Sequence, residues 1–362
     1  MNAAGFHRPK GPHKGQGLLD HQPKRSLMKR FILFAIAMFL SASAVQAATF
    51  TPCGASGDQG PTQSVCDTAY GGAVSVSVSG GIQTWTVPAT GTYRITATGA
   101  QGASGQDGQV GGRGARIVGE FSLAAGQTLK LAVGQQGSGQ SSGSNGGGGG
   151  GSFVVSSADV PLLIAGGGGG TRAAAGQDGC DASITQLAVT GSGGSSTSSC
   201  SLKTSGAGQG GIISSDSYGA AGAGFNSDGA TDPGYGTHGG GYDWLNGMLG
   251  GASDYDCAFP AVGGFGGGGD GRGCYGGGGG GGYSGGDGGL IAGGGGSYNT
   301  GSNPSATAGV GTGDGSIVIE TLGPTAAPAP TLSAYGMILL SGLLALVGVA
   351  LLRRRHRQIA ST

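Results

Sequence analysis

Charged and aromatic side chains are scarce in this 362-residue sequence. Only 10% of the residues are charged and 6% are aromatic, while 89 are Gly. Ordinary globular domains have about 25% charged residues. Because Gly brings no side chain to a core, the composition argues against an ordinary soluble enzyme. Intrinsic disorder is the usual outcome for Gly-rich sequence, but the low charge and the β-branched runs argue against it here.

Basic residues are also scarce in the body of the chain, although the formal net charge is zero. Residues 48–328 hold 82 of the 89 Gly. Residues 48–352 contain seven Lys and Arg against 17 Asp and Glu, because the other basic residues lie at the two ends. A nucleic-acid-binding surface needs clustered Lys and Arg to neutralise phosphates. We therefore expect no nucleic-acid partner.

The residues that catalysis needs are missing as well. His238 is the only histidine of the body and lies in a Gly-rich loop, and no Gly-x-Ser-x-Gly elbow stands between a strand and a helix. The sequence has no Cys-x-x-Cys pair for zinc. Asp254 and Asp256 offer oxygen ligands for a hard cation, but a solvated loop is the stronger interpretation. We predict no enzyme activity, no cofactor and no metal; a hydrolase using His238 is the weaker alternative.

Residues 28–47 have the pattern of a secretory signal peptide. A basic start at Met28-Lys29-Arg30 precedes the apolar run Phe31–Leu40, and Val45-Gln46-Ala47 supplies small residues at the cleavage positions. We expect cleavage after Ala47; retention as an anchor is the alternative. The polar residues 1–27 are either an upstream mis-assigned start or part of an extended signal peptide.

The C-terminal region has the pattern of a membrane anchor. The apolar stretch Tyr335–Leu352 is just long enough to span a bilayer, and four arginines lie in residues 353–357. The positive-inside rule keeps these arginines cytoplasmic, which places the body on the far side of the inner membrane. Residues 325–330 are rich in proline and predict a stiff spacer.

The spacer leads into a short motif made of Pro330, Thr331, Leu332, Ser333 and Gly336. With these residues the C-terminal region resembles the bacterial IPTL-CTERM sorting signal. Ala329, Ala334 and Tyr335 depart from it. The resemblance implies an exosortase-like membrane enzyme that processes the tail in a Gram-negative bacterium.

Alternating apolar and polar residues predict strands in the body. The predicted strands are residues 74–78, 82–87, 93–97, 115–123, 128–133 and 316–321. No stretch of the body has sustained helical periodicity with caps. We therefore predict an all-β scaffold, with the strands in an antiparallel sandwich.

The glycine runs 146–151, 166–170 and 276–282 need a different conformation, since Gly is poor in both helices and strands. Gly recurs every third residue from Gly99 to Gly114. A left-handed extended helix has three residues per turn and no internal hydrogen bonds, so its N–H and C=O groups point to its neighbours. Several such helices can bundle and satisfy each other's backbone groups. Collagen is excluded because residues 99–114 contain no proline.

The most specific stretches of the body are residues 85–99, 276–283 and the pair 163–166 and 290–293, which both read Leu-Ile-Ala-Gly. With these stretches the body, from about residue 82 to 321, resembles the glycine-rich extracellular domain of the anaplastic lymphoma kinase and leukocyte tyrosine kinase receptors. The resemblance implies a tumour-necrosis-factor-like β-sandwich with inserted polyglycine-II helices. No kinase is implied, because only ten residues follow the membrane segment.

Six cysteines in an exported chain predict disulfides, and we expect sequential pairing among the 15 possible connectivities. These are Cys53, Cys66, Cys180, Cys200, Cys257 and Cys274. The segment 235–260 is rich in large side chains, which gives Tyr242, Trp244 and Tyr255 as candidate ligand contacts. A small satellite core around Trp244 is the favoured alternative.

These observations divide the chain into six parts: an upstream extension with signal peptide (1–47), a Cys-containing segment (48–80), a glycine-rich domain (81–322), a spacer with the sorting motif (323–332), a transmembrane helix (333–352) and a cytoplasmic basic tail (353–362). We expect an exported bacterial surface or matrix protein, anchored or sorted through its C-terminus, with an adhesive or structural role. It lies in the periplasm on a single-pass inner-membrane anchor or is released to the cell surface after processing. The alternative is a receptor-like module for a protein or glycan ligand.

Overall fold

The computed structural model describes most of the body of the chain. The described residues are 47–104, 109–139, 145–172, 178–191, 200–213, 219–232, 239–252, 261–271 and 276–323, with 342, 344–345, 347–349 and 351–353. The chain divides into two units, Met1–Ala44 and Val45–Thr362. All the described strands belong to the second unit.

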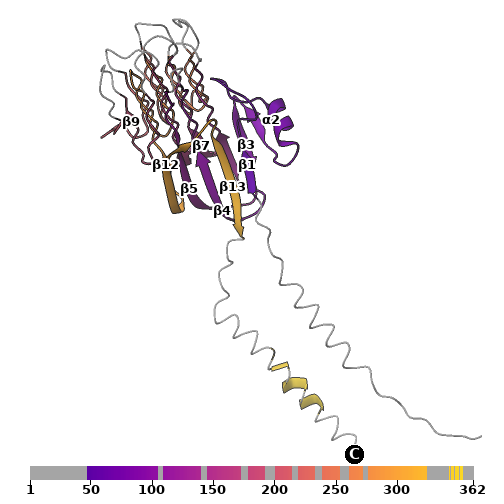
Figure 1. Ribbon diagram of the computed structural model, residues 1–362. Coiled ribbons are helices and arrows are strands. Elements are labelled where there is room, and N and C mark those ends of the chain that lie inside the picture. The colour runs from indigo at the N-terminus through magenta and orange to yellow at the C-terminus, as the bar shows by residue number, and fades with distance from the viewer. Residues whose placement is uncertain are drawn as a thin grey trace, which may run out of the picture. The chain divides into compact units, whose positions relative to one another are not determined.

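Two antiparallel sheets make up the scaffold (Figure 1). The first has the order β1 (Ala47–Phe50), β13 (Ser316–Gly323), β4 (Gly91–Thr98), β5 (Gly114–Leu123) and β12 (Ser302–Gly311). The second has the order β11 (Tyr298–Asn299), β8 (Pro161–Ala165), β7 (Ser152–Ser156), β6 (Thr128–Ala132), β3 (Ile82–Thr86) and β2 (Ser77–Ser79). A short ladder joins β9 (Val189–Thr190) to β10 (Ser201–Leu202). The described body is all-β, as predicted.

The two sheets pack face to face because their strands alternate. In β4, Tyr93, Ile95 and Ala97 are buried, while Arg94 between them is exposed. They meet Leu131 of β6 and Val154 of β7 from the second sheet in one apolar core. Burying each of the larger aliphatic side chains, such as Ile95 and Leu131, contributes roughly 1.5–3 kcal/mol. The predicted period-two pattern is therefore the pattern that builds this core.

One helix was not predicted. Helix α2 (Gln63–Tyr70) ends at Gly71, whose φ of 54° gives the left-handed C-cap that glycine allows. Its N-cap is Thr62, a residue type favoured at this position, but the side chain makes no capping bond. The helix is held instead by tertiary contacts, which periodicity and capping rules do not detect.

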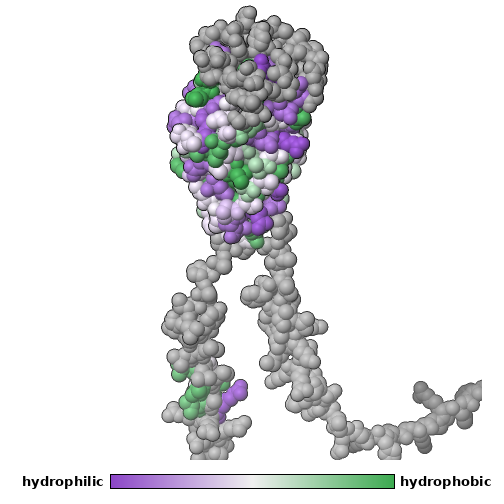
Figure 2. All heavy atoms as spheres, turned by 60° about the vertical axis from the view of Figure 1, so that its left-hand side comes forward, coloured by the Kyte–Doolittle hydropathy of each residue, from purple (hydrophilic) through white to green (hydrophobic). Residues whose placement is uncertain are grey.

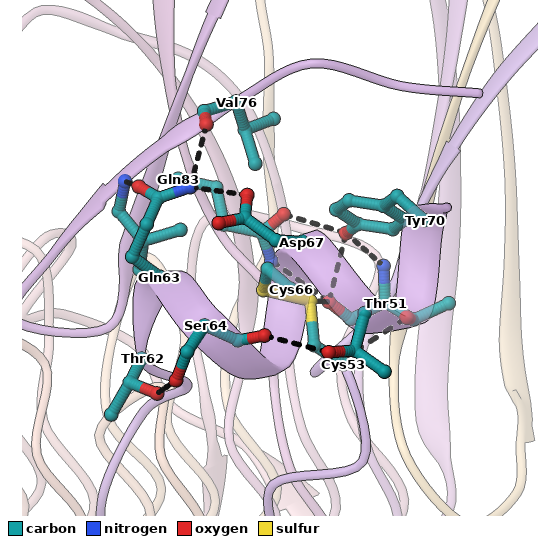
Figure 3. Close-up of a disulfide and its surroundings, with 12 residues drawn as sticks. Thr51, Cys53, Thr62, Gln63, Ser64, Cys66, Asp67, Tyr70, Val76 and Gln83 are labelled. Atoms are coloured by element: carbon teal, nitrogen blue, oxygen red, sulfur yellow. Dashed lines mark hydrogen bonds between the residues drawn. A yellow bond between two sulfur atoms is a disulfide. The ribbon is translucent and has the colours of Figure 1, made fainter. Parts of the chain in front are cut away.

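Side-chain hydrogen bonds fix α2 to the strands, and Figure 3 shows them around a disulfide. The Tyr70 hydroxyl donates to Gln83 Oε1 over 2.6 Å and accepts the Thr51 N–H over 3.1 Å. Gln83 Nε2 donates in turn to the Thr51 carbonyl at 2.8 Å. Burial raises the pKa of Tyr70, which keeps its hydroxyl a donor. The disulfide Cys53–Cys66 lies beside this network.

The second disulfide, Cys180–Cys200, closes the segment that carries β9. Both observed bridges join neighbouring cysteines in the sequence, as the sequential pairing predicts. Cys257 and Cys274 lie outside the described residues.

The glycine-rich segments between strands pack into a second body, which we call the glycine bundle: the described residues of 99–113, 134–151, 166–182 and 206–297. Every third residue of the run 166–171 bonds to the same neighbour. Gly167 and Gly170 donate their N–H groups to the segment 276–282, while Gly168 and Thr171 donate theirs to the segment 99–104. The neighbours of this run are the segments 99–104, 109–115, 145–151, 178–182, 276–282 and 292–297.

Backbone hydrogen bonds thus join one run to six neighbouring segments, and bundling through backbone groups is what we expected from the sequence. Side chains would prevent it. A Cβ placed on Gly168 would overlap the carbonyl oxygen of Gly112, and one on Gly170 would overlap that of Gly146. The bundle is therefore held together by its backbone.

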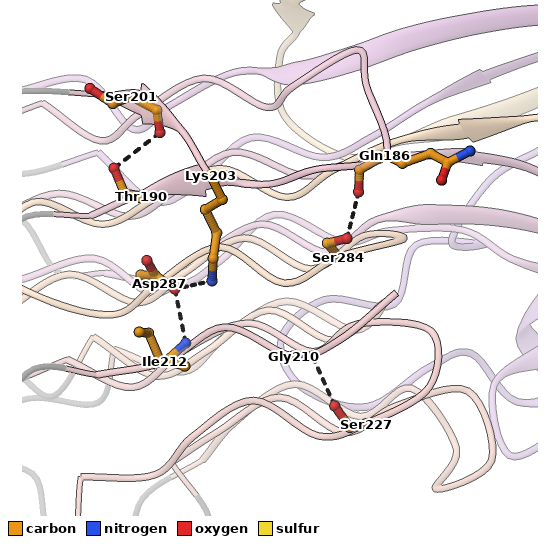
Figure 4. Close-up of polar contacts among 9 residues, drawn as sticks. All are labelled: Gln186, Thr190, Ser201, Lys203, Gly210, Ile212, Ser227, Ser284 and Asp287. Atoms are coloured by element: carbon orange, nitrogen blue, oxygen red, sulfur yellow. Dashed lines mark hydrogen bonds and ion pairs between the residues drawn. The ribbon is translucent and has the colours of Figure 1, made fainter. Parts of the chain in front are cut away.

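A few polar side chains form hydrogen bonds and an ion pair to residues of the bundle (Figure 4). Asp287 Oδ1 accepts from Lys203 Nζ at 2.6 Å and from the Ile212 N–H at 2.9 Å. The Ser227 hydroxyl accepts the Gly210 N–H at 2.9 Å. Each contact joins segments distant in the sequence.

The first and last strands of the body lie side by side. Ala47 of β1 pairs with Glu320 of β13, and Phe50 pairs with Ile317. Residues 47 and 323 therefore leave the sheet at the same end. The glycine bundle continues from the opposite end, where β4 gives way to Gly99. Figure 1 shows its threads beyond that end of the strands.

Residues 342–353, where described, have helical backbone. Among all described residues, no helix is both long enough and apolar enough to cross a bilayer.

Candidate functional site

The segment around Trp244 covers the outer face of the six-stranded sheet. Strands β7 and β8 bury side chains on both faces, so Phe153 and Ile164 point away from the inter-sheet core toward this segment. The buried members of this outer cluster are Ala132, Phe153, Val155, Ile164, Phe225, Trp244, Met248 and Phe265. The Trp244 ring stacks on Phe225 with centroids 5.8 Å apart. The cluster forms a second core.

Trp244 is 4% exposed and its ring belongs to this second core, in agreement with the satellite-core alternative. Its role as a ligand contact stays a prediction. Tyr242 is half-buried, and its N–H donates to the Leu249 carbonyl at 3.0 Å. Tyr255, the remaining candidate, lies outside the described residues.

The turn after Trp244 is fixed by hydrogen bonds from both sides. The Asp243 carboxylate accepts the Asn246 N–H at 2.9 Å, and the Asp243 carbonyl accepts the Met248 N–H at 3.0 Å. Asp228 accepts the Asp243 N–H at 2.7 Å and the Asn246 side-chain amide at 3.0 Å. Met248 is fully buried and has a φ of 60°, a backbone conformation that is costly for a residue other than glycine. The turn therefore has one well-defined shape.

The indole N–H of Trp244 reaches a charged pair on the sheet. It donates to Asp159 Oδ1 at 2.8 Å, and Lys130 Nζ lies 2.7 Å from the same oxygen. Hydrogen bonds from Lys130 and then from Trp244 lower the pKa of Asp159. The carboxylate thus stays ionised, and both bonds end on one of its two oxygens.

A hollow of about 280 Å³ lies where this pair meets the turn. Its lining residues are Ser79, Ile82, Thr84, Lys130, Asp159 and Trp244, together with Leu245. The Leu245 side chain is 81% exposed. We call these seven residues the Leu245 surface. It combines an apolar floor, a rim with both charges and a projecting aliphatic side chain, which suits contact with a protein.

A second hollow of about 270 Å³ lies where the edges of the two sheets meet, between β11 and β12. The lining residues that matter here are Ile184, Tyr298, Asn299, Pro304 and Ala306. Ile184 is 44% exposed. The Tyr298 ring stacks on Tyr283 with centroids 4.5 Å apart, which fixes one wall.

Figure 2 shows hydrophobic residues in small groups among hydrophilic ones over its visible face. Among the residues the structure describes, no three His, Cys, Asp or Glu side chains are grouped to hold a metal ion. Of the hollows among the described residues, we take the Leu245 surface and the hollow between β11 and β12 as candidate contact sites.

Sequence reasoning missed the residues that define these surfaces. Leu245 was one of several large residues in a Gly-rich segment, and nothing in the sequence separates an exposed leucine from a buried tryptophan beside it. Lys130 and Asp159 lie 29 residues apart and meet only because β6 pairs with β7. His238 and the sorting-motif residues Pro330, Thr331, Leu332, Ser333 and Gly336 lie outside the described residues.

Comparison with known proteins adds two findings. The model of the IPTL-CTERM motif matches residues 327–355. The chain is also 42% identical to the leukocyte tyrosine kinase receptor of Mus musculus over 95 residues. This match covers 24% of the chain and 11% of the receptor, so the chain spans only a small part of that relative.

Proposed function

We propose that the chain is an exported, C-terminally sorted surface or matrix protein that displays the glycine bundle for an adhesive or structural role. The match of residues 327–355 to the IPTL-CTERM motif supports export and sorting. The proposal includes signal-peptide cleavage after Ala47, a membrane helix over 333–352 and processing by an exosortase-like enzyme.

The pairing of β1 with β13 is the observation that carries the display role. Both ends of the described body leave the same end of the sheet, and the bundle continues from the other. Residues 324–332 span at most about 30 Å when fully extended. A chain held at the membrane by its tail would therefore keep the sandwich close to the bilayer and the bundle facing outward.

The backbone hydrogen bonds of the bundle support a rigid display element. Interior runs bond to up to six neighbours, and the pairs Lys203–Asp287 and Cys180–Cys200 add cross-links. We assign the segments the polyglycine-II conformation and the scaffold a tumour-necrosis-factor-like arrangement. Such a body resists local opening better than a flexible glycine linker would.

Cell fractionation with mass spectrometry of both mature termini tests the proposal. We expect an N-terminus at Ala48, a membrane or surface location, and a C-terminus either intact or cut near residue 330. Full-length protein that begins at Met1 and stays in the cytoplasm would overturn it.

A second candidate function is a receptor-like binding module for a protein or glycan. The likeness to the mouse receptor favours it, although over a small part of that protein. We place the ligand at the hollow between β11 and β12. Saturable binding of one labelled ligand should then weaken in Ile184→Asp but not in Val160→Asp, an equally drastic change at an exposed site outside that hollow.

We also propose that the chain is not an enzyme. Its body contains a single histidine, His238, and acyl-transfer chemistry of the Ser/His/Asp or Cys/His type needs such a base. Turnover of a substrate by the purified protein that disappears in His238→Ala would refute this.

A further inference from the structure

Leu245 has the largest exposed fraction of any large hydrophobic side chain in the described part of the chain, at 81%. Single exposed leucines are ordinary on flexible loops. Leu245 stands on a turn that is held by the hydrogen bonds of Asp228 and Asp243. The burial of Met248 fixes the other end of this turn. A fixed, exposed aliphatic side chain loses little conformational entropy when a partner covers it.

The hollow beside Leu245 is the complement of such a side chain. Ile82 and Trp244 give the hollow apolar walls. Thr84 lies two residues after Ile82, on the same face of β3. Lys130 and Asp159 supply one charge of each sign at its rim. A projecting side chain, a hollow and charges of both signs on one surface make it self-complementary, as a twofold, isologous contact needs, because each feature then meets its complement on an identical copy.

We propose that the Leu245 surface binds a second copy of this chain, with Leu245 of each copy seated in the hollow of the other. The charges argue for this occupant: under twofold symmetry Lys130 of one copy approaches Asp159 of its mate, and Asp159 has a second carboxylate oxygen for that contact. The surface lies on the outer face of the six-stranded sheet. Pairing there leaves β1, β13 and the edge strand β12 uncovered, so it goes beyond the display role and does not depend on it.

Site-specific photo-crosslinking tests the contact in the full chain in its own cells. A benzophenone amino acid replaces Leu245, and the same probe at Ile212, which is 61% exposed on the glycine bundle, is the matched control. We expect a covalent dimer from position 245 whose adducts map to residues 79–84, and none from position 212. No adduct, adducts only with another protein, or a dimer linked through other residues would each overturn the proposal.

A second variant separates loss of contact from loss of folding. With the probe at Thr84, Leu245→Asp should lower the dimer yield about tenfold, the effect of removing a central interface anchor. Because Leu245 is exposed, the thermal unfolding midpoint should not change. An unchanged dimer yield in this variant would also overturn the proposal. Mass spectrometry of the termini, which tests export, is read independently of the crosslink.

Discussion

Nζ of Lys203 lies 2.6 Å from Oδ1 of Asp287, a residue of the glycine bundle. The two side chains are 14% and 9% exposed, so this ion pair is largely withdrawn from water. The bundle has few other side chains with which to compensate the loss of either partner.

Lys203→Met should therefore lower the free energy of unfolding by about 3 kcal/mol, because it leaves the Asp287 carboxylate buried without its cation. Urea denaturation measures the change. Arg94→Met is the matched control, since the Arg94–Glu120 pair has an Arg side chain that is 45% exposed. It should cost less than about 1 kcal/mol. Equal losses in the two variants would show that burial does not govern these pairs.

Gly168→Ala should destabilise the protein by about 2–3 kcal/mol or more, because the new Cβ overlaps the Gly112 carbonyl and the backbone must move. Gly239→Ala is the matched control: its nearest neighbour would be the Ala220 Cβ at 3.2 Å. Thermal unfolding followed by circular dichroism compares them. If both variants unfold at the same temperature, the tight packing of the bundle is not what stabilises it.

Replacing both cysteines of the Cys53–Cys66 bridge by serine should cost roughly 3 kcal/mol, since the bridge closes a loop of 13 residues. The hydrogen bonds of Tyr70 and Gln83 remain, so we expect α2 to loosen without loss of the sandwich. Amide hydrogen exchange should rise over residues 51–70 and stay low over β4. Uniformly faster exchange would instead make this bridge a requirement for the whole fold.

Asp243→Asn should raise the free energy of unfolding at pH 7. Burial, with a further contribution from the charge of Asp228, raises the pKa of Asp243 above its usual value. The folded state therefore binds this proton more tightly than the unfolded state, and its contribution to stability is lost as pH rises through the folded pKa. Asn keeps an oxygen acceptor for the Asn246 N–H. A lower stability of this variant at pH 7 would contradict the argument.

Asp159→Asn should have the opposite effect. The pKa of Asp159 is lowered by Lys130 and Trp244, so its contribution is present above the unfolded pKa and is lost as pH falls through the folded pKa. The variant should be less stable than the parent at pH 7, with the difference shrinking in acid. Unfolding curves of the parent and of both variants at pH 7 and pH 3 check the two predictions. If the stability difference between Asp159→Asn and the parent grows in acid, the lowered pKa of Asp159 is contradicted.

The sequence predicted those strands whose two faces differ. Strands β4, β5 and β13 bury one face, and their alternation showed it. Strands β7 and β8 were missed because Phe153 and Val154 are buried on opposite faces, so their residues do not alternate. Strand β12 was missed for the reverse reason, since it is an exposed edge with almost no apolar face.

The glycine bundle was predictable because Gly recurs every third residue in parts of the sequence, such as Gly99 to Gly114. The Leu245 surface was not. Its parts come from β2, β3, β6, the turn at Asp159 and the segment that contains Trp244 and Leu245, and only the three-dimensional pairing of these segments brings them together. Local sequence patterns therefore predicted several strands and the glycine bundle. The contact surface could not be predicted in this way because it depends on the topology of the fold.

Strands β1 and β13 are the first and last of the described strands, yet each Cα partner of Ala47–Phe50 lies within Ile317–Glu320. In a chain threaded through a membrane pore from its N-terminus, the five-stranded sheet must wait for its final strand to emerge. Residues 48–316 would cross before the fold can close. Completion of the sandwich would then coincide with the arrival of the C-terminal residues at the pore.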